Sequence, residues 1–166
     1  MIRMIQHTDA DELFELVSSN REYLRKWLPW LDYNKSIDDT RSFIKTSLAD
    51  YANNKSMVHV VVDKQIVGVC GYNSFNHSIK AGYVGYWIAE SHQGNGLATS
   101  SCKELERIGF ELLKLNKIEI HAATENIKSR KVAEKLNYAE TGRILDAEWL
   151  YDHYVDHIIY CKRSKC

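Results

Sequence analysis

The sequence contains few of the residues that mark specialised classes of protein. Its four cysteines form neither a Cys-x-x-Cys pair nor a metal-ligand spacing, so we expect free thiols in a reducing cytoplasm and no bound metal. No apolar run reaches membrane-spanning length, and we expect no signal segment. Lysine plus arginine and aspartate plus glutamate each number 22, so the basic excess of a general nucleic-acid-binding protein is missing. We therefore predict a cytoplasmic protein that binds neither membranes nor nucleic acid.

Length and composition favour one domain. With 166 residues, of which 45% are hydrophobic and 27% charged, the chain is long enough to bury a substantial core. Proline occurs once, at Pro29, and no linker, repeat or low-complexity tract divides the sequence. We expect a single domain over residues 1–166.

The most informative stretch is residues 83–113. Residues 83–88 are an apolar, aromatic run with the composition of a strand, and two glycines, Gly94 and Gly96, follow in a short polar loop. From Leu97 onward, apolar residues recur at helical spacing. A strand, a glycine loop and a helix start in this order direct backbone N–H groups and the positive end of the helix dipole at an anion. The stretch therefore predicts a binding site for phosphate, and more specifically for pyrophosphate.

Two common phosphate loops do not fit this stretch. A Walker loop requires lysine after its last glycine, and the dinucleotide-binding pattern requires glycine where this chain has Thr99. Gln93, Gly96 and Ala98 instead fit the pattern Gln/Arg-x-x-Gly-x-Gly/Ala. In this respect the loop resembles the acetyl-CoA pyrophosphate loop of the GNAT superfamily of N-acetyltransferases.

The rest of the chain alternates between strand-like and helix-like segments. Capping patterns at Thr8 and Ser36 predict two helices, of which the first extends to Pro29 and the second to about Asn53. A further helix is expected over residues 126–136. Strands are predicted over residues 2–5, 57–62, 66–72, 83–88, 117–122, 139–150 and 154–161. The strands over residues 57–62, 66–72 and 83–88 are expected to form an antiparallel meander. A helical crossover leads from there to the strand over residues 117–122, which is expected to be parallel to the strand over residues 83–88.

Three further segments carry the same resemblance. Residues 126–138 are similar to the GNAT segment in which an asparagine, here Asn126, opens the helix that holds the pantetheine and sulfur end of CoA. Residues 27–30 and 154–157 are similar to the RimJ/RimL branch, whose members acetylate protein N-termini, notably of ribosomal proteins. The resemblance implies one α/β (α+β) domain of the GNAT fold, with a mixed, mostly antiparallel sheet of about six to seven strands and helices on both faces. It also implies acetyl-CoA as co-substrate, and a homodimer.

The resemblance places the CoA contacts in three segments. These are a strand backbone that pairs with the pantetheine as an added strand would, the glycine loop with its helix start, and the helix that Asn126 opens. The residues concerned are Trp87, Ile88, Ala89, Gln93, Gly94, Asn95, Gly96, Leu97, Ala98, Thr99, Asn126 and Ser129. Lys128, Arg130 and Lys131 are candidates for the 3′-phosphate, and a solvated helix face is the alternative explanation of these three cations.

Acetyl transfer to an amine needs a proton donor for the leaving thiolate. The tyrosine that is the donor in many GNAT enzymes falls at Ala133 in this chain, and the resemblance gives the role to Ser129 instead. The alternatives are that Ser129 is only a small residue that leaves room for CoA, and that Tyr138 is the donor.

The reaction also needs a proton acceptor for the ammonium. Glu148 matches the carboxylate proposed as base in RimL-like enzymes, with a solvent-facing glutamate as the alternative. A carboxylate with a pKa near ~4.3 is a weak base for an ammonium, so burial beside Trp149 or a water relay is expected to assist it. His59, His121 and His157 have more suitable pKa values, but each lies in a strand run where a lone histidine is usually packed and hydrogen-bonded.

Together these residues predict an acetyl-CoA-dependent N-acetyltransferase that acts by direct transfer in a ternary complex. Cys102 and Cys161 lie away from the expected sulfur site, which disfavours an acetyl-cysteine intermediate. The expected acceptor is a protein N-terminal α-amino group of the ribosomal-protein type, bound at an aromatic lip formed by Trp27, Trp30 and Tyr33. The alternatives are a polyamine, aminoglycoside or amino-acid amine as acceptor, and a non-catalytic acyl-CoA-binding module.

Overall fold

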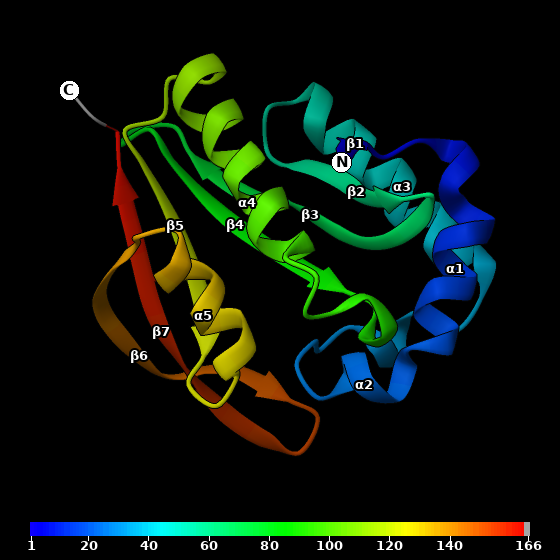
Figure 1. Ribbon diagram of the computed structural model, residues 1–166. Coiled ribbons are helices and arrows are strands. Elements are labelled where there is room, and N and C mark those ends of the chain that lie inside the picture. Colours follow the sequence, from blue (N-terminus) through cyan, green and yellow to red (C-terminus); the bar gives the residue numbers. More distant parts are fainter. Residues whose placement is uncertain (165–166) are drawn as a thin grey trace.

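The computed structural model describes residues 1–164 and is built around one seven-stranded sheet (Figure 1). The strands lie in the order β1-β2-β3-β4-β5-β7-β6. All neighbouring strands are antiparallel except β4 and β5, which are parallel because a helical crossover connects them. The bounds are β1 (Ile2–Met4), β2 (Met57–Asp63), β3 (Gln65–Asn76), β4 (Ala81–Ile88), β5 (Lys117–Ala123), β6 (Ala139–Leu150) and β7 (His153–Arg163). The mixed, mostly antiparallel sheet is confirmed.

Helices cover both faces of the sheet, as predicted (Figure 1). One face carries α1 (Ala10–Ser19), α2 (Arg21–Arg25) and α3 (Ile37–Ala52), and the other carries α4 (Leu97–Arg107) and α5 (Ile127–Lys135). Short turns of helix lie at His7–Asp9, Leu31–Tyr33, Glu90–His92 and Ile108–Leu112, the last of them π-helical. Because side chains alternate along a strand, each strand supplies both cores: Val60 packs under α1–α3 and Val61 under α4 and α5. Within residues 1–164, no helix has the length and apolar composition needed to cross a membrane.

The caps of the N-terminal helices match the predictions only in part. At α3 the predicted capping box is confirmed, because the Ser36 hydroxyl accepts from the Asp39 N–H and the Asp39 carboxylate accepts from the Ser36 N–H. The predicted start at Thr8 is wrong. There the Asp9 carboxylate accepts from the N–H of Gln6, so the capping pair lies two residues earlier than the sequence pattern indicated.

The helix predicted to run unbroken to Pro29 is divided at Asn20. The Asn20 side-chain amide donates to the carbonyl of Leu16, a local bond that competes with continuation of the helix. Its side-chain oxygen accepts from the N–H of Glu90, directly after β4. The break thus ties the end of α1 to the end of β4 and redirects the chain into the aromatic segment 27–33.

The parallel pair β4–β5 separates partway along its length. Residues 81–84 pair with residues 117–120, and the pairing stops there. Beyond that point β4 stays paired with β3 as far as Ile88, and β5 stays paired with β7 as far as Ala123. The sheet therefore opens into two halves, with β1–β4 on one side of the gap and β5, β7 and β6 on the other.

Candidate active site

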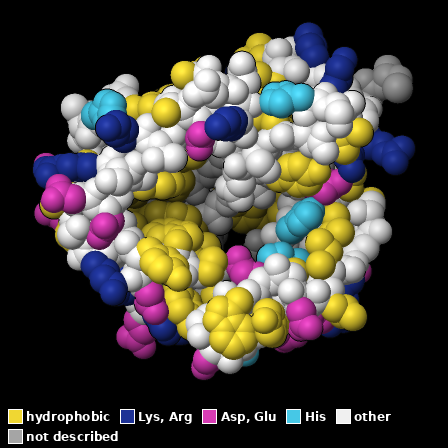
Figure 2. Space-filling model, turned by 180° about the vertical axis from the view of Figure 1, so that it is seen from behind, with side chains coloured by type: hydrophobic (Ala, Val, Ile, Leu, Met, Phe, Trp, Pro, Cys, Tyr) yellow, Lys and Arg dark blue, Asp and Glu magenta, His cyan; other side chains and the backbone are white. Residues whose placement is uncertain are grey.

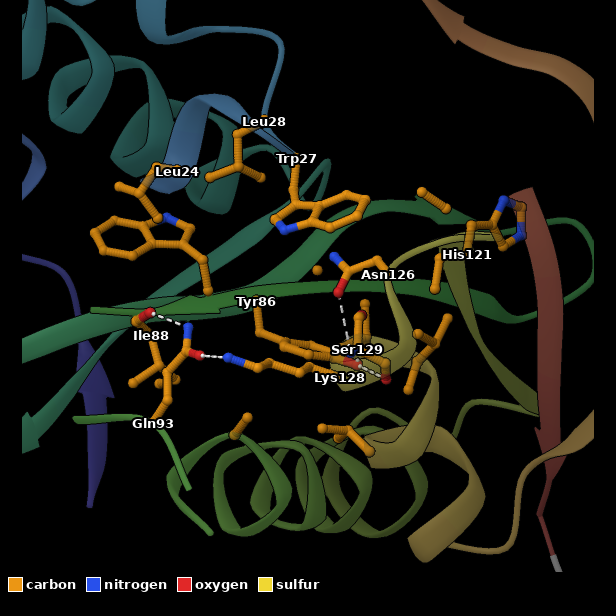
Figure 3. Close-up of a pocket in the computed structure, with 18 of the residues that line it drawn as sticks. Leu24, Trp27, Leu28, Tyr86, Ile88, Gln93, His121, Asn126, Lys128 and Ser129 are labelled. Carbon is orange, nitrogen blue, oxygen red and sulfur yellow. Dashed lines mark hydrogen bonds between the residues drawn. The ribbon is translucent and has the colours of Figure 1, made fainter. Parts of the chain in front are cut away.

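A cavity of about 1160 Å³ occupies the gap between the two halves of the sheet. Its helical arm lies on the side of α4 and α5 and is lined by Tyr86, Ile88, Gln93, Gly94, Gly96, Leu97, Ala98, Thr99, Asn126, Lys128 and Ser129. Its aromatic arm lies on the opposite side and is lined by Trp27, Leu28, Trp30, Tyr83, Trp87, His121, Glu148 and His157. Figure 2 shows the molecule hollowed at its centre, with hydrophobic side chains gathered on one wall and histidine and acidic side chains on the other. Figure 3 shows Trp27, Leu28 and His121 across β4 from Gln93, Lys128 and Ser129.

The edge of β4 that faces the gap carries unpaired backbone groups. The N–H of Ala89 donates to the carbonyl of Val67 on the β3 side at 2.8 Å. Because backbone groups point alternately to the two sides of a strand, those of Trp87 also face β3, while those of Tyr86 and Ile88 face the gap. The Ile88 carbonyl accepts from the Gln93 side-chain amide at 3.3 Å. Within residues 1–164, the N–H and C=O of Tyr86 and the N–H of Ile88 are therefore the groups with which an extended ligand could pair as an added strand.

The glycine loop lies at the end of the helical arm. Gly94 and Gly96 have φ values of 80° and 76°, and nothing lies within 4 Å of an added Cβ at either position. Glycine is therefore required by the backbone conformation and not by crowding. Gly96 is the N-cap of α4, so the N–H groups of the next three residues have no carbonyl partner within the helix and are free for an anion.

Gln93 connects this loop to its surroundings. Its side-chain amide N–H groups donate to the Tyr23 hydroxyl and, at 3.3 Å, to the carbonyl of Ile88, while its side-chain oxygen accepts from Lys128 Nζ at 2.8 Å (Figure 3). The glutamine therefore links α2, β4 and α5 across the arm.

The cations of α5 divide between two environments. Lys128, Lys131 and Lys135 line the cavity. Arg130 instead donates to the Tyr160 hydroxyl and to the carbonyl of Thr124, both at 3.0 Å. Arg130 is thus held on the sheet, which leaves the lysines as the cations of the helical arm.

Asn126, Ser129 and Tyr86 form one hydrogen-bonded unit. The Asn126 side-chain oxygen accepts from the Ser129 N–H at 3.2 Å and caps α5. The Ser129 hydroxyl donates to the Tyr86 hydroxyl at 3.1 Å, and the Tyr86 hydroxyl donates to the Ser129 carbonyl at 2.9 Å. Burial raises the pKa of Tyr86, so this phenol stays protonated at neutral pH. Tyr138 is buried in the core beneath α4 and does not line the cavity.

Among residues 1–164, Glu148 is the one acidic residue that lines the cavity. Its carboxylate lies 3.7 Å from Nε2 of His157, and the two side chains are 29% and 17% exposed. The expected burial beside Trp149 is wrong, because neighbours on a strand point to opposite faces. Trp149 faces away, 52% exposed, and packs edge-on against Tyr154.

A bulge in β6 sets the register of Glu148. Residues 145–147 lie opposite the single residue Asp156 of β7. One Asp156 oxygen accepts from the Asp146 N–H at 2.8 Å, and the other accepts from Arg143 at 2.5 Å. These two bonds lower the pKa of Asp156 and keep it ionised. The bulge is therefore held by a charged anchor, and Glu148 follows directly after it.

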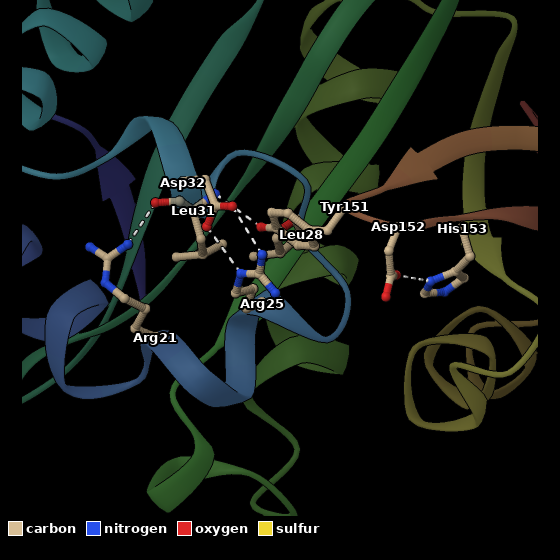
Figure 4. Close-up of polar contacts among 8 residues, drawn as sticks. All are labelled: Arg21, Arg25, Leu28, Leu31, Asp32, Tyr151, Asp152 and His153. Atoms are coloured by element: carbon tan, nitrogen blue, oxygen red, sulfur yellow. Dashed lines mark hydrogen bonds and ion pairs between the residues drawn. The ribbon is translucent and has the colours of Figure 1, made fainter.

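The aromatic arm is closed on one side by the segment 27–30, with Trp30 and Trp87 6.4 Å apart between ring centroids. The β6–β7 turn fixes this segment (Figure 4). The Tyr151 hydroxyl donates to the carbonyl of Leu28 and accepts from the N–H of Leu31. Arg25 stacks 3.6 Å above the Tyr151 ring. The turn thus joins the two halves of the sheet across the gap.

Three of the residues predicted for the site lie outside the cavity lining. Ala89 has both backbone groups engaged, because its carbonyl accepts from the His92 N–H. Asn95 lies at the exposed tip of the loop, and Tyr33 is 82% exposed. Tyr86 is the main residue that the sequence interpretation missed, since a tyrosine inside an aromatic strand run is indistinguishable from a core residue.

Fold and site together define an acyl-CoA-dependent transferase, with an anion-binding helix start beside a strand edge that is free to pair with an extended ligand. More specifically, the chain belongs to the acetyltransferase (GNAT) domain family, whose family model matches residues 1–139. It is therefore an N-acetyltransferase that uses acetyl-CoA, and the resemblance noted in its glycine loop is confirmed.

Individual relatives cover nearly the whole chain. YdaF of Bacillus subtilis (strain 168), to which a ribosomal N-acetyltransferase activity is ascribed, is 31% identical over 96% of this chain and 88% of its own. The ribosomal-protein-serine acetyltransferase of Escherichia coli (strain K12) is 25% identical over 97% of this chain and 90% of its own. Among solved structures, the microcin C7 self-immunity acetyltransferase MccE, in complex with acetyl-CoA and AMP, has a TM-score of 0.91 at 28% identity, covering 98% of this chain and 92% of that one.

Proposed function

We propose that the protein acetylates N-terminal α-amino groups of proteins of the ribosomal type, by direct transfer in a ternary complex. The observation that carries this proposal is the continuity of the cavity through the gap between β4 and β5. A thioester in the helical arm and an amine in the aromatic arm can meet there without a covalent enzyme intermediate. The ribosomal acceptor is supported by the named activities of the two relatives above. The cytoplasmic location and the homodimer expected from the sequence remain predictions.

Each part of acetyl-CoA has residues suited to it. The N–H groups at the start of α4 suit the pyrophosphate, and the lysines of α5 suit the 3′-phosphate. The backbone groups of Tyr86 and the N–H of Ile88 suit the pantetheine amides. Ser129 and Tyr86 supply hydroxyl groups where the thiolate is expected, and Glu148 supplies a carboxylate on the acceptor side.

Removal of the paired hydroxyls tests the proposed proton donor. Ser129→Ala and Tyr86→Phe are each expected to lower kcat by about tenfold to a hundredfold, because the leaving thiolate then lacks a positioned proton. Since the two hydroxyls are bonded to each other, the double variant is expected to be little slower than the slower single variant. Steady-state thiol release measures both effects, with acetyl-CoA affinity as the control. An unchanged kcat in Ser129→Ala would leave Ser129 only the role of a small residue beside CoA.

A small acceptor with a flat ring is the second candidate. It is favoured by the aromatic arm, where Trp27, Trp30, Tyr83 and Trp87 line one continuous surface. AMP in the related microcin C7 self-immunity acetyltransferase shows that this fold accommodates a nucleotide in that protein. An aminoacyl nucleotide would place its base against such a surface and its amine near Glu148.

The acceptor class is tested by thiol release from acetyl-CoA against a panel. The panel contains ribosomal N-terminal peptides, the same peptides with blocked N-termini, amino-acid esters of adenosine, polyamines, aminoglycosides and free amino acids. We expect turnover with the free peptides and none with the blocked ones, with the product identified by mass spectrometry. Turnover confined to the adenosine esters would transfer the proposal to the second candidate. Tight acetyl-CoA binding with no turnover across the panel would contradict both candidates and favour a binding module.

A further inference from the structure

A second carboxylate–imidazole pair, Glu119 and His121, lies on the same face of the sheet as Glu148 and His157. His121 Nε2 lies 3.0 Å from one oxygen of Glu119, and the other oxygen of Glu119 lies 2.5 Å from Lys117 Nζ. The Glu119 side chain is 11% exposed and the His121 side chain 30% exposed. Of these three, only His121 lines the cavity. A buried carboxylate outside the cavity thus binds an imidazole that lines the cavity.

The bond to Glu119 sets the tautomer of His121. With the Nε2 hydrogen donated to the carboxylate, the lone pair of the neutral ring is on Nδ1. Within residues 1–164, Nδ1 has no hydrogen-bond partner, and the ring meets Tyr83 edge-on at 5.8 Å. Burial works against the charge of Glu119, but the bonds from Lys117 and His121 outweigh it and the pKa of Glu119 lies below its ordinary value. The carboxylate therefore stays ionised and can stabilise a protonated imidazole.

The strand register places both pairs on one face of the sheet. His121 lies opposite Ile159, and Ala123 lies opposite His157, so the two histidines occupy diagonal positions on neighbouring strands, which lie about 7–8 Å apart in such a pair. Glu148 lies opposite Val155, two residues from His157 on the same face. The titratable and charged groups on this face around His121 are Lys117 and Glu119 of β5 itself, Tyr83 of β4, His157 and Cys161 of β7, and Glu148 of β6.

The reaction removes two protons from the acceptor nitrogen. A primary amine enters as R–NH3⁺ and leaves as R–NH–CO–CH3; the C–N bond forms, the C–S bond breaks, and its electron pair goes to sulfur. One proton is balanced by protonation of the thiolate, and the other passes to solvent. A carboxylate that has accepted the first of these protons cannot accept the second until it has released the first. A second proton acceptor in the same arm therefore shortens the catalytic cycle.

We propose that His121, oriented by Glu119, is a second proton acceptor for the amine nitrogen, acting directly or through one water. Glu119 is a positioning residue in this scheme, because it holds the imidazole and stabilises its protonated form without lining the cavity. His121 then releases the proton to solvent, to which its side chain is partly exposed. The inference rests on the proposed function, since it assigns a role within the same transfer.

The test is the pH dependence of kcat/KM for the acceptor identified by the panel. His121→Gln is expected to lower kcat by at least tenfold and to remove the acid limb of the profile, because the glutamine side chain cannot take up a proton. Glu119→Gln, which keeps a hydrogen-bonding amide but no charge, is expected to lower kcat in the same direction with an unchanged KM for acetyl-CoA. Because it leaves the ring in place, it also tests the pair if His121→Gln does not fold.

Two further variants assign the effect. His153 also pairs with a carboxylate, that of Asp152 at 2.6 Å, but this pair is exposed at the β6–β7 turn and lies outside the cavity. His153→Gln is therefore the matched control and should keep the wild-type profile. His157→Gln should keep the acid limb that His121→Gln removes. An acid limb that disappears in His157→Gln and persists in His121→Gln, or an unchanged kcat in His121→Gln, would overturn the proposal. No turnover by the wild-type protein with any acceptor would contradict the proposed function instead.

Discussion

Replacement of Glu148 by glutamine is expected to lower kcat by about 10²- to 10⁴-fold, the range that a positioned general base contributes. In the described part of the chain, no other residue that lines the cavity carries a carboxylate. Glutamine keeps the size of Glu148 and a hydrogen-bonding oxygen but cannot take up a proton.

The measurement is kcat at saturating acetyl-CoA and acceptor, with the dissociation constant of acetyl-CoA determined on the same samples. The helical arm is not altered, so that constant should stay within about twofold of the wild-type value. Glu140→Gln is the matched control, since Glu140 lies on the same strand, is exposed and does not line the cavity. If Glu148→Gln retained the full kcat, the base would have to be His121 or the neutral fraction of the amine itself.

The cofactor side of the site could be predicted from the sequence because it depends on short local motifs. The left-handed glycines and the asparagine cap each fix a backbone geometry within a few residues of themselves. Their spacing was therefore enough to predict a pyrophosphate loop at Gly96 and a helix start at Asn126. The same holds for the hairpin of β2 and β3, which turns at Lys64 with φ of 64°.

The acceptor side could not be predicted in the same way, because it is made by pairing between distant strands. The insertion of β7 between β5 and β6 brings His121, His157 and Glu148 onto one face, and nothing local to any of them indicates that order. The bulge held by Asp156 likewise has no signature in residues 145–147. The expected burial of Glu148 by Trp149 was wrong for a local reason, since adjacent strand residues point to opposite faces, although the place of Glu148 in the cavity agrees with the predicted role.

The second large effect concerns folding and arises at Gly109. This glycine lies in the π-helical turn that continues α4, and an added Cβ would lie 2.1 Å from the Tyr72 hydroxyl oxygen and 2.9 Å from Cδ1 of Ile118. Tyr72 is fully buried on β3, and its hydroxyl donates to the carbonyl of Leu105 at 2.7 Å. Glycine is therefore required here so that the helix can approach the sheet closely enough for this bond.

Gly109→Ala is expected to destabilise the protein by about 3–5 kcal/mol, because it overpacks a closed core and breaks a buried hydrogen bond. For a chain of this size that corresponds to a fall in Tm of roughly 10 °C, measured by calorimetry or thermal circular dichroism. Gly142→Ala is the matched control: the nearest atom to its added Cβ is 3.8 Å away, so its stability should change by less than about 0.5 kcal/mol.

A double variant separates the collision from other effects of the added methyl group. Tyr72→Phe alone removes one of the two donors to the Leu105 carbonyl, which keeps the Ile108 N–H, at a cost of about 0.5–1.5 kcal/mol. Combined with Gly109→Ala it also removes the atom that the new Cβ meets, so the double variant should be more stable than Gly109→Ala alone. A Gly109→Ala protein within 1 kcal/mol of wild type would instead mean that the π-helical turn can move off the sheet without loss. In that case the start of α4, and with it the pyrophosphate loop, would not depend on the contact between Gly109 and Tyr72 for its position.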